Sequence, residues 1–265
     1  MTASRPQDPQ TLLCERCGYV IEGLASDSVC PECGSPIAPS LPDRRTGTPT
    51  QNRPGVGSGL VTAWLVVRRP LETLDVMKVA PPRIRGLVLL AALPLGQLMG
   101  VGLLLAFEVH RSLPSGGSTV WTPGSVVGSL ALGVVLGLLL TPVAAAGLAV
   151  LTWIEARGLV VFGARSGFRM HPTLAQAIVR HGAAGWLVTG LGAALVLPLA
   201  WSFEVEVGPL LGRPPFGDPP AWIMALAALG ILLSVLGFLF FEFFAWLGLR
   251  RCRFANSRRP CTDTR

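Results

Sequence analysis

Four long apolar segments dominate the pattern of hydrophobic and polar positions along the chain. They cover approximately residues 86–107, 126–154, 184–203 and 222–249. Because a helix rises 1.5 Å per residue, about 20 apolar residues cross the roughly 30 Å hydrocarbon core of a bilayer. The pattern predicts an all-α integral membrane bundle of four transmembrane helices within residues 83–249. A fifth span hidden after the second is the alternative, but it would place Glu155 and Arg157 inside the bilayer.

The segment before the first span has a helical period. Over residues 60–82, apolar side chains recur at Trp64, Val67, Leu71 and Leu74 among basic positions. This pattern predicts an amphipathic helix at the membrane interface, with Pro70 as a break. A soluble helix that packs on the N-terminal domain is the alternative.

Residues 39–59 have no such period. They are rich in Pro, Gly, Ser and Thr. A segment of this composition buries too little apolar area to order itself, so a disordered linker is expected.

The N-terminal residues 11–38 contain two C-x-x-C pairs, each followed directly by glycine. The pairs are Cys14 with Cys17 and Cys30 with Cys33. Glycine lets the backbone turn through positive φ just past the second ligand, and four thiolates suit tetrahedral Zn²⁺ in a closed, non-catalytic site. The spacing predicts a small β-type zinc ribbon that holds one structural Zn²⁺. A disulfide pair or chance clustering is the alternative.

Composition and charge place most of the chain in a membrane. Hydrophobic residues make up 51% of the chain and charged residues 14%. Of the 22 Lys and Arg residues, only Arg111 and Arg213 lie in the loops after the first and third spans. Positive charge gathers on the cytoplasmic side of membrane proteins. We therefore expect an integral protein of the plasma (inner) membrane with cytoplasmic N- and C-termini, where reducing conditions keep the thiols available as ligands.

Interfacial residues add detail to this topology. The basic tail, residues 250–265, is expected to lie on anionic lipid headgroups. Tryptophans prefer the membrane boundary. By position in the chain, Trp121, Trp201 and Trp222 mark the outer boundary, and Trp153, Trp186 and Trp246 mark the inner one.

Small residues follow one another at four-residue spacing in the first two spans. They are Gly96 and Gly100 in the first, and Ser129, Gly133, Gly137, Thr141, Ala145 and Ala149 in the second. Because lipid is as apolar as the helices, close packing through small residues holds such helices together. We expect helix packing here, with a substrate path as the alternative.

Two polar residues lie inside the predicted spans. Gln97 is near the middle of the first, and Glu242 is about two turns from the cytoplasmic end of the fourth. An acid at that depth is neutral, paired or hydrated. Both residues have a structural interpretation, and Glu242 also has a functional one in a proton-coupled transporter.

The N-terminal and membrane segments together resemble a known family. The motifs "CERCGYVIEGL" and "CPECGSPI", the following tether, the "W-x-x-x-x-R-P" entry helix and the Gly/Ala-rich spans resemble bacterial zinc-ribbon proteins fused to a Yip-type (Rab-interacting) membrane domain. The resemblance implies a non-enzymatic membrane protein concerned with membrane organisation or trafficking. It transfers no functional residue beyond the four cysteines.

These features favour binding over catalysis. The three histidines are dispersed and no paired-carboxylate or Ser-His-acid pattern converges, so no enzyme is expected. Residues 11–38 carry one base, Arg16, against Glu15, Glu22, Asp27 and Glu32, which disfavours nucleic acid. The leading hypothesis is a membrane-anchored adaptor whose ribbon binds a protein partner. A transporter or channel built from the bundle is the alternative.

Overall fold

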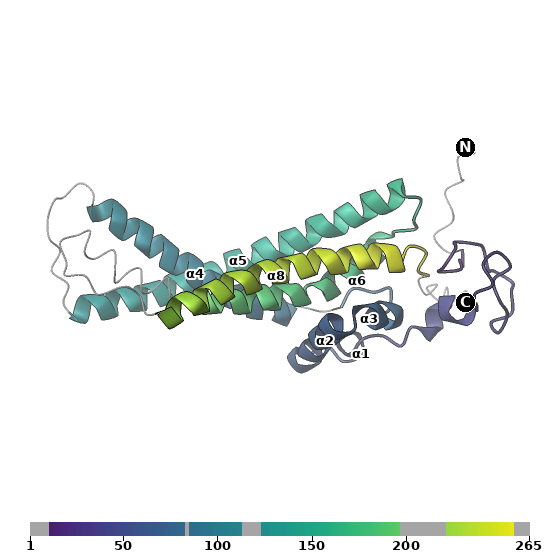
Figure 1. Cartoon of the computed structure of the whole chain (residues 1–265), viewed down its shortest axis with the longest axis horizontal. Coiled ribbons are helices and arrows are strands. Elements are labelled where there is room, and N and C mark those ends of the chain that lie inside the picture. Colours follow the sequence, from purple (N-terminus) through teal and green to yellow (C-terminus); the bar gives the residue numbers. More distant parts are fainter. Residues whose placement is uncertain (1–10, 83–84, 113–122, 197–220, 257–265) are drawn as a thin grey trace, which may run out of the picture. The chain divides into compact units, whose positions relative to one another are not determined.

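The computed structural model describes residues 11–82, 85–112, 123–196 and 221–256, and this part of the chain is mostly helical (Figure 1). Its labelled elements are η1 (Ala38–Ser40), η2 (Pro42–Arg44), α1 (Pro49–Asn52), α2 (Val56–Arg68), α3 (Pro70–Val76), α4 (Arg85–Ser112), α5 (Pro123–Arg165), α6 (Pro172–Gly182) and α8 (Ala221–Arg251). Residues 184–196 are also helical. Among the described residues, extended pairing is limited to the isolated bridges Leu13 with Val20 and Val29 with Pro36. The expected β-type ribbon therefore consists of turns and single bridges.

The chain divides into two compact units. Unit 1 comprises Met1–Ile84, Leu151–Ala184 and Phe241–Arg265, and unit 2 comprises Arg85–Val150 and Gly185–Phe240. The helices α5 and α8 each contribute residues to both units.

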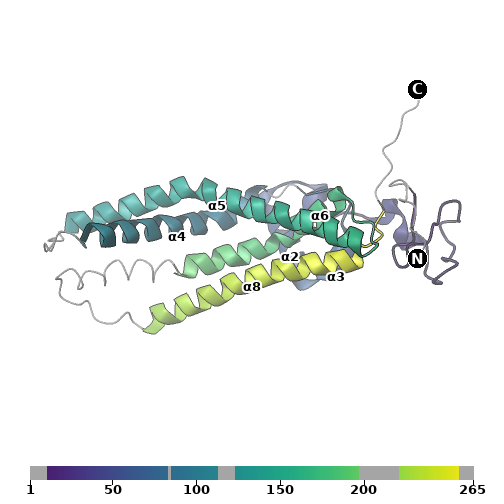
Figure 2. The same cartoon turned by 90° about the horizontal axis from the view of Figure 1, so that it is seen from above.

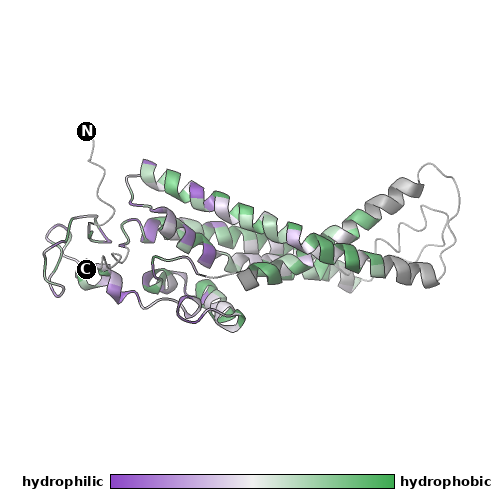
Figure 3. Cartoon of the chain, turned by 180° about the vertical axis from the view of Figure 1, so that it is seen from behind, coloured by the Kyte–Doolittle hydropathy of each residue, from purple (hydrophilic) through white to green (hydrophobic). Residues whose placement is uncertain are grey.

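Two of the described helices are long and apolar enough to cross a membrane. They are the segments Ala131–Arg165 of α5 and Met224–Arg251 of α8. Only 11% and 22% of their most apolar windows are buried, whereas the core helix of a soluble protein is mostly buried. Figure 3 shows apolar residues spread along both helices.

The other two predicted spans are only partly covered by this finding. The first falls on α4, in which Val88–Val101 is a shorter apolar stretch. The third is helical over residues 184–196, and its remainder lies outside the described residues. The coarse prediction of long apolar membrane helices is supported for two segments, and the number four stays a prediction.

Glycines set the helix contacts inside unit 2, where α4 lies beside α5 (Figure 2). A Cβ at Gly100 would lie 2.5 Å from the backbone nitrogen of Gly137, and one at Gly96 would lie 2.6 Å from Oγ1 of Thr141. Gly133 is also buried, and its carbonyl oxygen would lie 2.9 Å from a Cβ at Gly100. The structure thus brings these five small residues together.

The other three residues of the predicted stripe differ in exposure or lie outside this description. Ala145 is half-buried and Ala149 is exposed, while the side chain of Ser129 lies outside the described residues. A second glycine contact, absent from the sequence prediction, joins residues 184–196 to α8. There a Cβ at Gly237 would lie 2.6 Å from the carbonyl oxygen of Gly185.

Residues 39–59 differ from the disordered linker that their composition predicted. They form η1, η2, α1 and the start of α2, and Arg45, Thr48 and Thr50 are buried. The Thr50 hydroxyl donates to Oγ1 of Thr62 on α2 at 2.7 Å, and the Thr50 backbone N–H reaches the same oxygen at 3.0 Å. Polar side chains that bond to neighbouring helices order this segment although it contains little apolar surface.

The predicted interfacial helix is two helices with the expected break at Pro70. Arg69 has φ −140° and ψ 63°, outside the helical region. The residue before proline is disfavoured in the α conformation, whereas proline fits the first turn of the next helix. The chain therefore ends α2 at Arg68 and starts α3 at Pro70.

Candidate metal centre

The four cysteines predicted as ligands converge in unit 1. Their sulfur atoms all lie within 4.8 Å of one another. The Sγ atoms of Cys14 and Cys33 are 3.7 Å apart, and those of Cys17 and Cys30 are 3.6 Å apart. Four sulfurs bound tetrahedrally at about 2.3 Å from Zn²⁺ would be separated by about 3.8 Å. The cluster therefore has the dimensions of a four-thiolate metal site.

Two matching turns position the ligands. The N–H of Gly18 donates to the carbonyl of Cys14 at 2.8 Å, and the N–H of Gly34 donates to the carbonyl of Cys30 at 2.9 Å. Both glycines have positive φ, +82° and +66°. This conformation is open to glycine at little cost, which explains why glycine follows each pair. We call the segment that carries both turns, residues 11–38, the knuckle.

The core beneath the sulfurs is small. It consists of Cys14, Cys30, Ile21 and Ile37, with Leu12, Cys33 and Leu41 packed against it. The five described cysteines are free thiols, so no disulfide joins them. A segment this short buries too little apolar surface to fold alone, and a bound ion would supply the missing free energy.

The thiols differ in acidity before any ion is considered. The Ser35 hydroxyl and backbone N–H lower the pKa of the Cys33 thiol to about 6, whereas desolvation raises the pKa of Cys17 to about 12. A dication bound to all four sulfurs would favour the thiolate at each of them.

A buried asparagine fastens the knuckle to the C-terminal end of the described chain. The backbone N–H of Leu13 donates to Oδ1 of Asn256 at 3.0 Å. The Nδ2 of Asn256 donates to the carbonyls of Leu13 and Ser40, each at 2.7 Å. Asn256 is 1% exposed, so its amide group forms its hydrogen bonds with protein groups.

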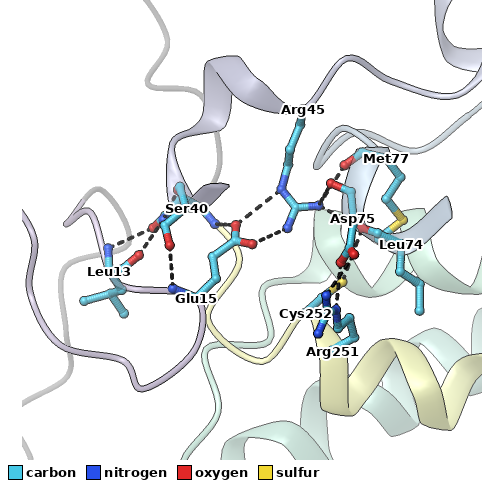
Figure 4. A network of polar contacts seen from close by, with 10 residues as sticks. Leu13, Glu15, Ser40, Arg45, Leu74, Asp75, Met77, Arg251 and Cys252 are labelled. Carbon is cyan, nitrogen blue, oxygen red and sulfur yellow. Dashed lines mark hydrogen bonds and ion pairs between the residues drawn. The ribbon is translucent and has the colours of Figure 1, made fainter. Parts of the chain in front are cut away.

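Arg45 links the knuckle to the end of α3 (Figure 4). Its Nη2 lies 2.6 Å from Oε2 of Glu15, a residue between two of the cysteines. Its Nη1 donates to the carbonyls of Leu74 and Met77, each at 3.0 Å. Those carbonyls lie at the C-terminal end of a helix, where a cation is favoured. Arg45 is 3% exposed, so its contacts replace the water that it would otherwise bind.

Burial of this ion pair has a cost. Desolvation raises the pKa of Glu15 even though Arg45 opposes the change. Taking two charges out of water commonly offsets much of their attraction, so the pair fixes geometry more than it stabilises. Removal of one partner alone would leave the other charge buried and unpaired.

The start of the predicted basic tail is docked in unit 1. Arg251 forms an ion pair with Asp75 at 2.7 Å, and Cys252 is buried with its thiol 3.9 Å from the carbonyl of Leu74. The ring of Phe254 covers Gly18, where a Cβ would lie 2.9 Å from it. Residues 250–256 therefore do not form a free tail, because Arg251, Cys252 and Phe254 contact other parts of unit 1. Residues 257–265 lie outside the description.

A buried histidine of α6 contacts Thr48, the residue that precedes α1, in the same unit. The Nδ1 of His181 lies 2.7 Å from the carbonyl oxygen of Ala177, and its Nε2 lies 3.0 Å from the hydroxyl of Thr48. These neighbours suit a neutral ring that donates from Nδ1 and accepts at Nε2. Burial lowers the pKa of His181 to about 4.

The two polar residues predicted inside spans have separate surroundings. In unit 2, Gln97 is half-buried and covers Gly137, and its Nε2 is 3.5 Å from the carbonyl of Val134. In unit 1, Glu242 on α8 is half-buried and interacts electrostatically with Glu155 on α5. Glu155 was not predicted as a companion of Glu242, because the pattern along the chain does not show which helices pair.

One tryptophan differs from its predicted place. Trp186 is 2% exposed and packs on Phe238, with ring centroids 6.2 Å apart, so it does not face the membrane boundary. Trp153 and Trp246 are exposed as expected of boundary residues, and Trp222 is exposed as well. Trp121 and Trp201 lie outside the described residues.

Comparisons of the chain with protein-family models, with curated proteins and with solved structures find no match.

Proposed function

We propose that the protein is a non-catalytic, membrane-anchored adaptor whose zinc-stabilised knuckle binds a protein partner. The observation that carries this proposal is the buried docking of the knuckle, within unit 1, on the segment that follows the membrane-length helix α8. Asn256 and Arg45 fix the knuckle there through hydrogen bonds to Leu13 and Glu15. A module held this way can present a surface in a constant orientation.

Zn²⁺ is the metal that suits the donor set best. Thiolates are soft ligands, and four of them at tetrahedral spacing favour zinc over harder cations. With four protein ligands, no coordination position remains for water or substrate. The metal would therefore stabilise the fold and would not take part in a reaction.

The outer surface of the knuckle supplies a binding face. Tyr19, Val20, Leu24 and Val29 are between 39% and 58% exposed. Several exposed apolar side chains within so small a module are typical of protein-binding surfaces. The acidic residues of the knuckle would repel nucleic acid, which is why we expect a protein there.

The proposed setting follows the charge pattern of the sequence. We place both termini in the cytoplasm and four spans in the plasma (inner) membrane, with anionic lipids at the cytoplasmic face. The resemblance to zinc-ribbon proteins with a Yip-type membrane domain supports a partner concerned with membrane organisation or trafficking.

Photo-crosslinking in cells tests the adaptor directly. A photoreactive residue at Tyr19 would be irradiated in the native chain and in the Cys30→Ser variant, and adducts would be identified by mass spectrometry. We expect a discrete protein that is captured only when all four cysteines are intact. Equal capture by the variant, or capture of nothing above its background, would argue against an adaptor.

The pair of acids favours a second candidate, a proton-coupled transporter. Glu155 and Glu242 lie on two helices of membrane length and interact with each other. Carboxyls on membrane-length helices are a means of coupling transport to proton movement. Proton flux into vesicles would fall strongly in the Glu242→Gln variant if this function is correct, and unchanged flux would exclude it.

A further inference from the structure

One side-chain pair recurs on three helices of unit 1. A tryptophan is followed four residues later by an arginine whose guanidinium lies over the indole ring. The pairs are Trp64 with Arg68 on α2, Trp153 with Arg157 on α5, and Trp246 with Arg250 on α8, with distances of 5.8, 5.3 and 4.7 Å from the guanidinium carbon to the ring centroid. Residues four apart lie on the same side of a helix, so each pair presents one amphipathic face.

In all three pairs the indole and the guanidinium are exposed to solvent. The indoles of Trp64, Trp153 and Trp246 are 60%, 56% and 47% exposed. The three arginines are exposed too, and no ion pair joins any of them to a carboxylate in the part of the chain that the structure describes. By contrast, the neighbouring Arg69 pairs with Glu72 at 3.1 Å. Each cation–indole pair is therefore open to an anion.

The helix α2 has two faces of different kinds. One face, with Thr62, Ala63 and Val66, is buried inside unit 1. The other is apolar yet exposed, and it carries Leu60, Val61, Trp64 and Val67. A contiguous apolar face next to an unpaired arginine calls for an apolar occupant with negative charge at its edge.

We propose that Trp64 and Arg68, with the exposed apolar face of α2, form a membrane-contact site in which the indole enters the headgroup boundary and the guanidinium binds a lipid phosphate. Arginine forms bidentate hydrogen bonds with phosphate oxygens, and an indole ring favours the membrane boundary. Trp153 with Arg157 and Trp246 with Arg250 are the equivalent contacts on two membrane-length helices. The inference deepens the proposed function, because it rests on the membrane anchorage and names the anionic phospholipid that unit 1 contacts.

Continuity with the membrane helices favours a lipid over a protein at this face. Two of the three pairs lie on α5 and α8, the helices that are long enough to span a bilayer, and Trp246 with Arg250 lies at the end of the apolar stretch of α8. The same pair on α2, with the same spacing and exposure, suits the same environment. A membrane can bury the exposed apolar face of α2 and also provide a phosphate for the guanidinium of Arg68.

Fluorescence quenching in nanodiscs tests the site with the full-length protein. The discs would contain phosphatidylcholine and phosphatidylglycerol, either unmodified or brominated in the acyl chain close to the headgroup. The fluorescence of one indole is obtained by subtracting the emission of the variant in which that tryptophan is replaced by Phe from the emission of the native chain. For Trp64 we expect brominated discs to remove most of that emission. In unmodified discs, we expect the aqueous quencher acrylamide to leave most of it in place. Trp186→Phe is the control, since that indole is buried in protein.

The outcomes separate this inference from the proposal on which it rests. Quenching of Trp153 and Trp246 but not of Trp64 would overturn the α2 site and leave the membrane anchorage intact. No quenching of any of the three would reject the anchorage itself. Neither result bears on the capture of a partner at Tyr19. A photoreactive residue at Val61 gives an independent measurement, in which a lipid adduct is expected and a protein adduct would overturn the site.

The arginine is tested by lipid affinity. Short-chain phosphatidylglycerol would be titrated onto the purified protein and counted by native mass spectrometry. Arg68→Gln should weaken binding by up to about fivefold, the effect of one basic residue near an anionic surface. Arg44→Gln removes the same charge from an exposed arginine that has no indole beneath it, and should change little. Equal effects of the two substitutions would contradict a specific site.

Discussion

Unit 1 and unit 2 are each stabilised internally, and the contacts that stabilise them are of different kinds. In unit 1, buried polar side chains such as Arg45, Asn256 and His181 bond to groups far away in the sequence. In unit 2, the described helices meet through glycines, and a Cβ at Gly100 would overlap the backbone of α5. Close packing through small residues is what holds helices together where the surroundings are as apolar as the helices themselves. Substitutions should therefore damage one unit without damaging the other.

The largest expected effect is the loss of the metal. Cys30→Ser should abolish stoichiometric zinc binding and unfold the knuckle, since structural zinc contributes about 10–16 kcal/mol in small zinc domains. Elemental analysis and limited proteolysis of residues 11–45 would measure this, while the thermal unfolding of unit 2 in detergent should not change. Cys252→Ser is the matched control, because that buried thiol lies outside the cluster. One equivalent of zinc bound with native affinity by Cys30→Ser would refute the four-thiolate site.

The next effect concerns the buried ion pair. Arg45→Met should destabilise unit 1 by about 3–5 kcal/mol, because Glu15 would stay buried without its cation. Arg69→Met removes an exposed partner of Glu72 and should cost less than about 1 kcal/mol. Zinc release during urea unfolding, followed with a chromogenic chelator, gives both values. Similar values for the two variants would mean that Arg45 has no special role.

The stability of unit 2 should fall when a glycine at a helix contact is replaced by a larger residue. Gly137→Leu should lower its stability by at least about 1–3 kcal/mol, because a Cβ at this position would lie 2.5 Å from Oε1 of Gln97. Gly147→Leu on the same helix is the control, since no atom lies within 4 Å of its Cβ position. Melting in detergent would show the difference, and zinc affinity should be native in both. Identical melting of the two variants would refute glycine-mediated packing.

The smallest expected effect is a dependence of the stability of unit 1 on pH. Burial lowers the pKa of His181 to about 4 from 6.5, so the unfolded chain binds a proton that the folded chain excludes. The stability from His181 is complete above pH 6.5 and falls as pH decreases toward 4, by about 1.4 kcal/mol for each pH unit. The unfolding midpoint of unit 1, measured between pH 7 and pH 5.5, should fall more in the native chain than in His181→Gln. Parallel slopes would show that His181 titrates normally.

Local patterns predicted part of this architecture well. The spacing of the cysteines and their glycines is a local signal, so the cluster of Cys14, Cys17, Cys30 and Cys33 followed from sequence. Long apolar stretches likewise predicted α5 and α8 as membrane-length helices. Both signals depend only on neighbours within a few turns of the chain.

Contacts between distant residues were not predictable in this way. Nothing near Arg45 or Asn256 in the sequence marks them as buried, because their partners are supplied by other elements. The linker prediction failed for the same reason, since its threonines and Arg45 are ordered by α2 and α3. Trp186 was assigned to the boundary from its position along the chain, whereas its burial depends on the face that it presents to α8.

The hydrogen bonds of Asn256 have a consequence for biosynthesis. They join Leu13 to a residue 243 positions later in the chain. A ribosome releases the knuckle long before it makes α8 and the segment that follows. The cysteines can bind their metal early, but the knuckle cannot dock until α8 and the segment with Asn256 have been translated. A nascent chain therefore carries the knuckle undocked until Asn256 has been added.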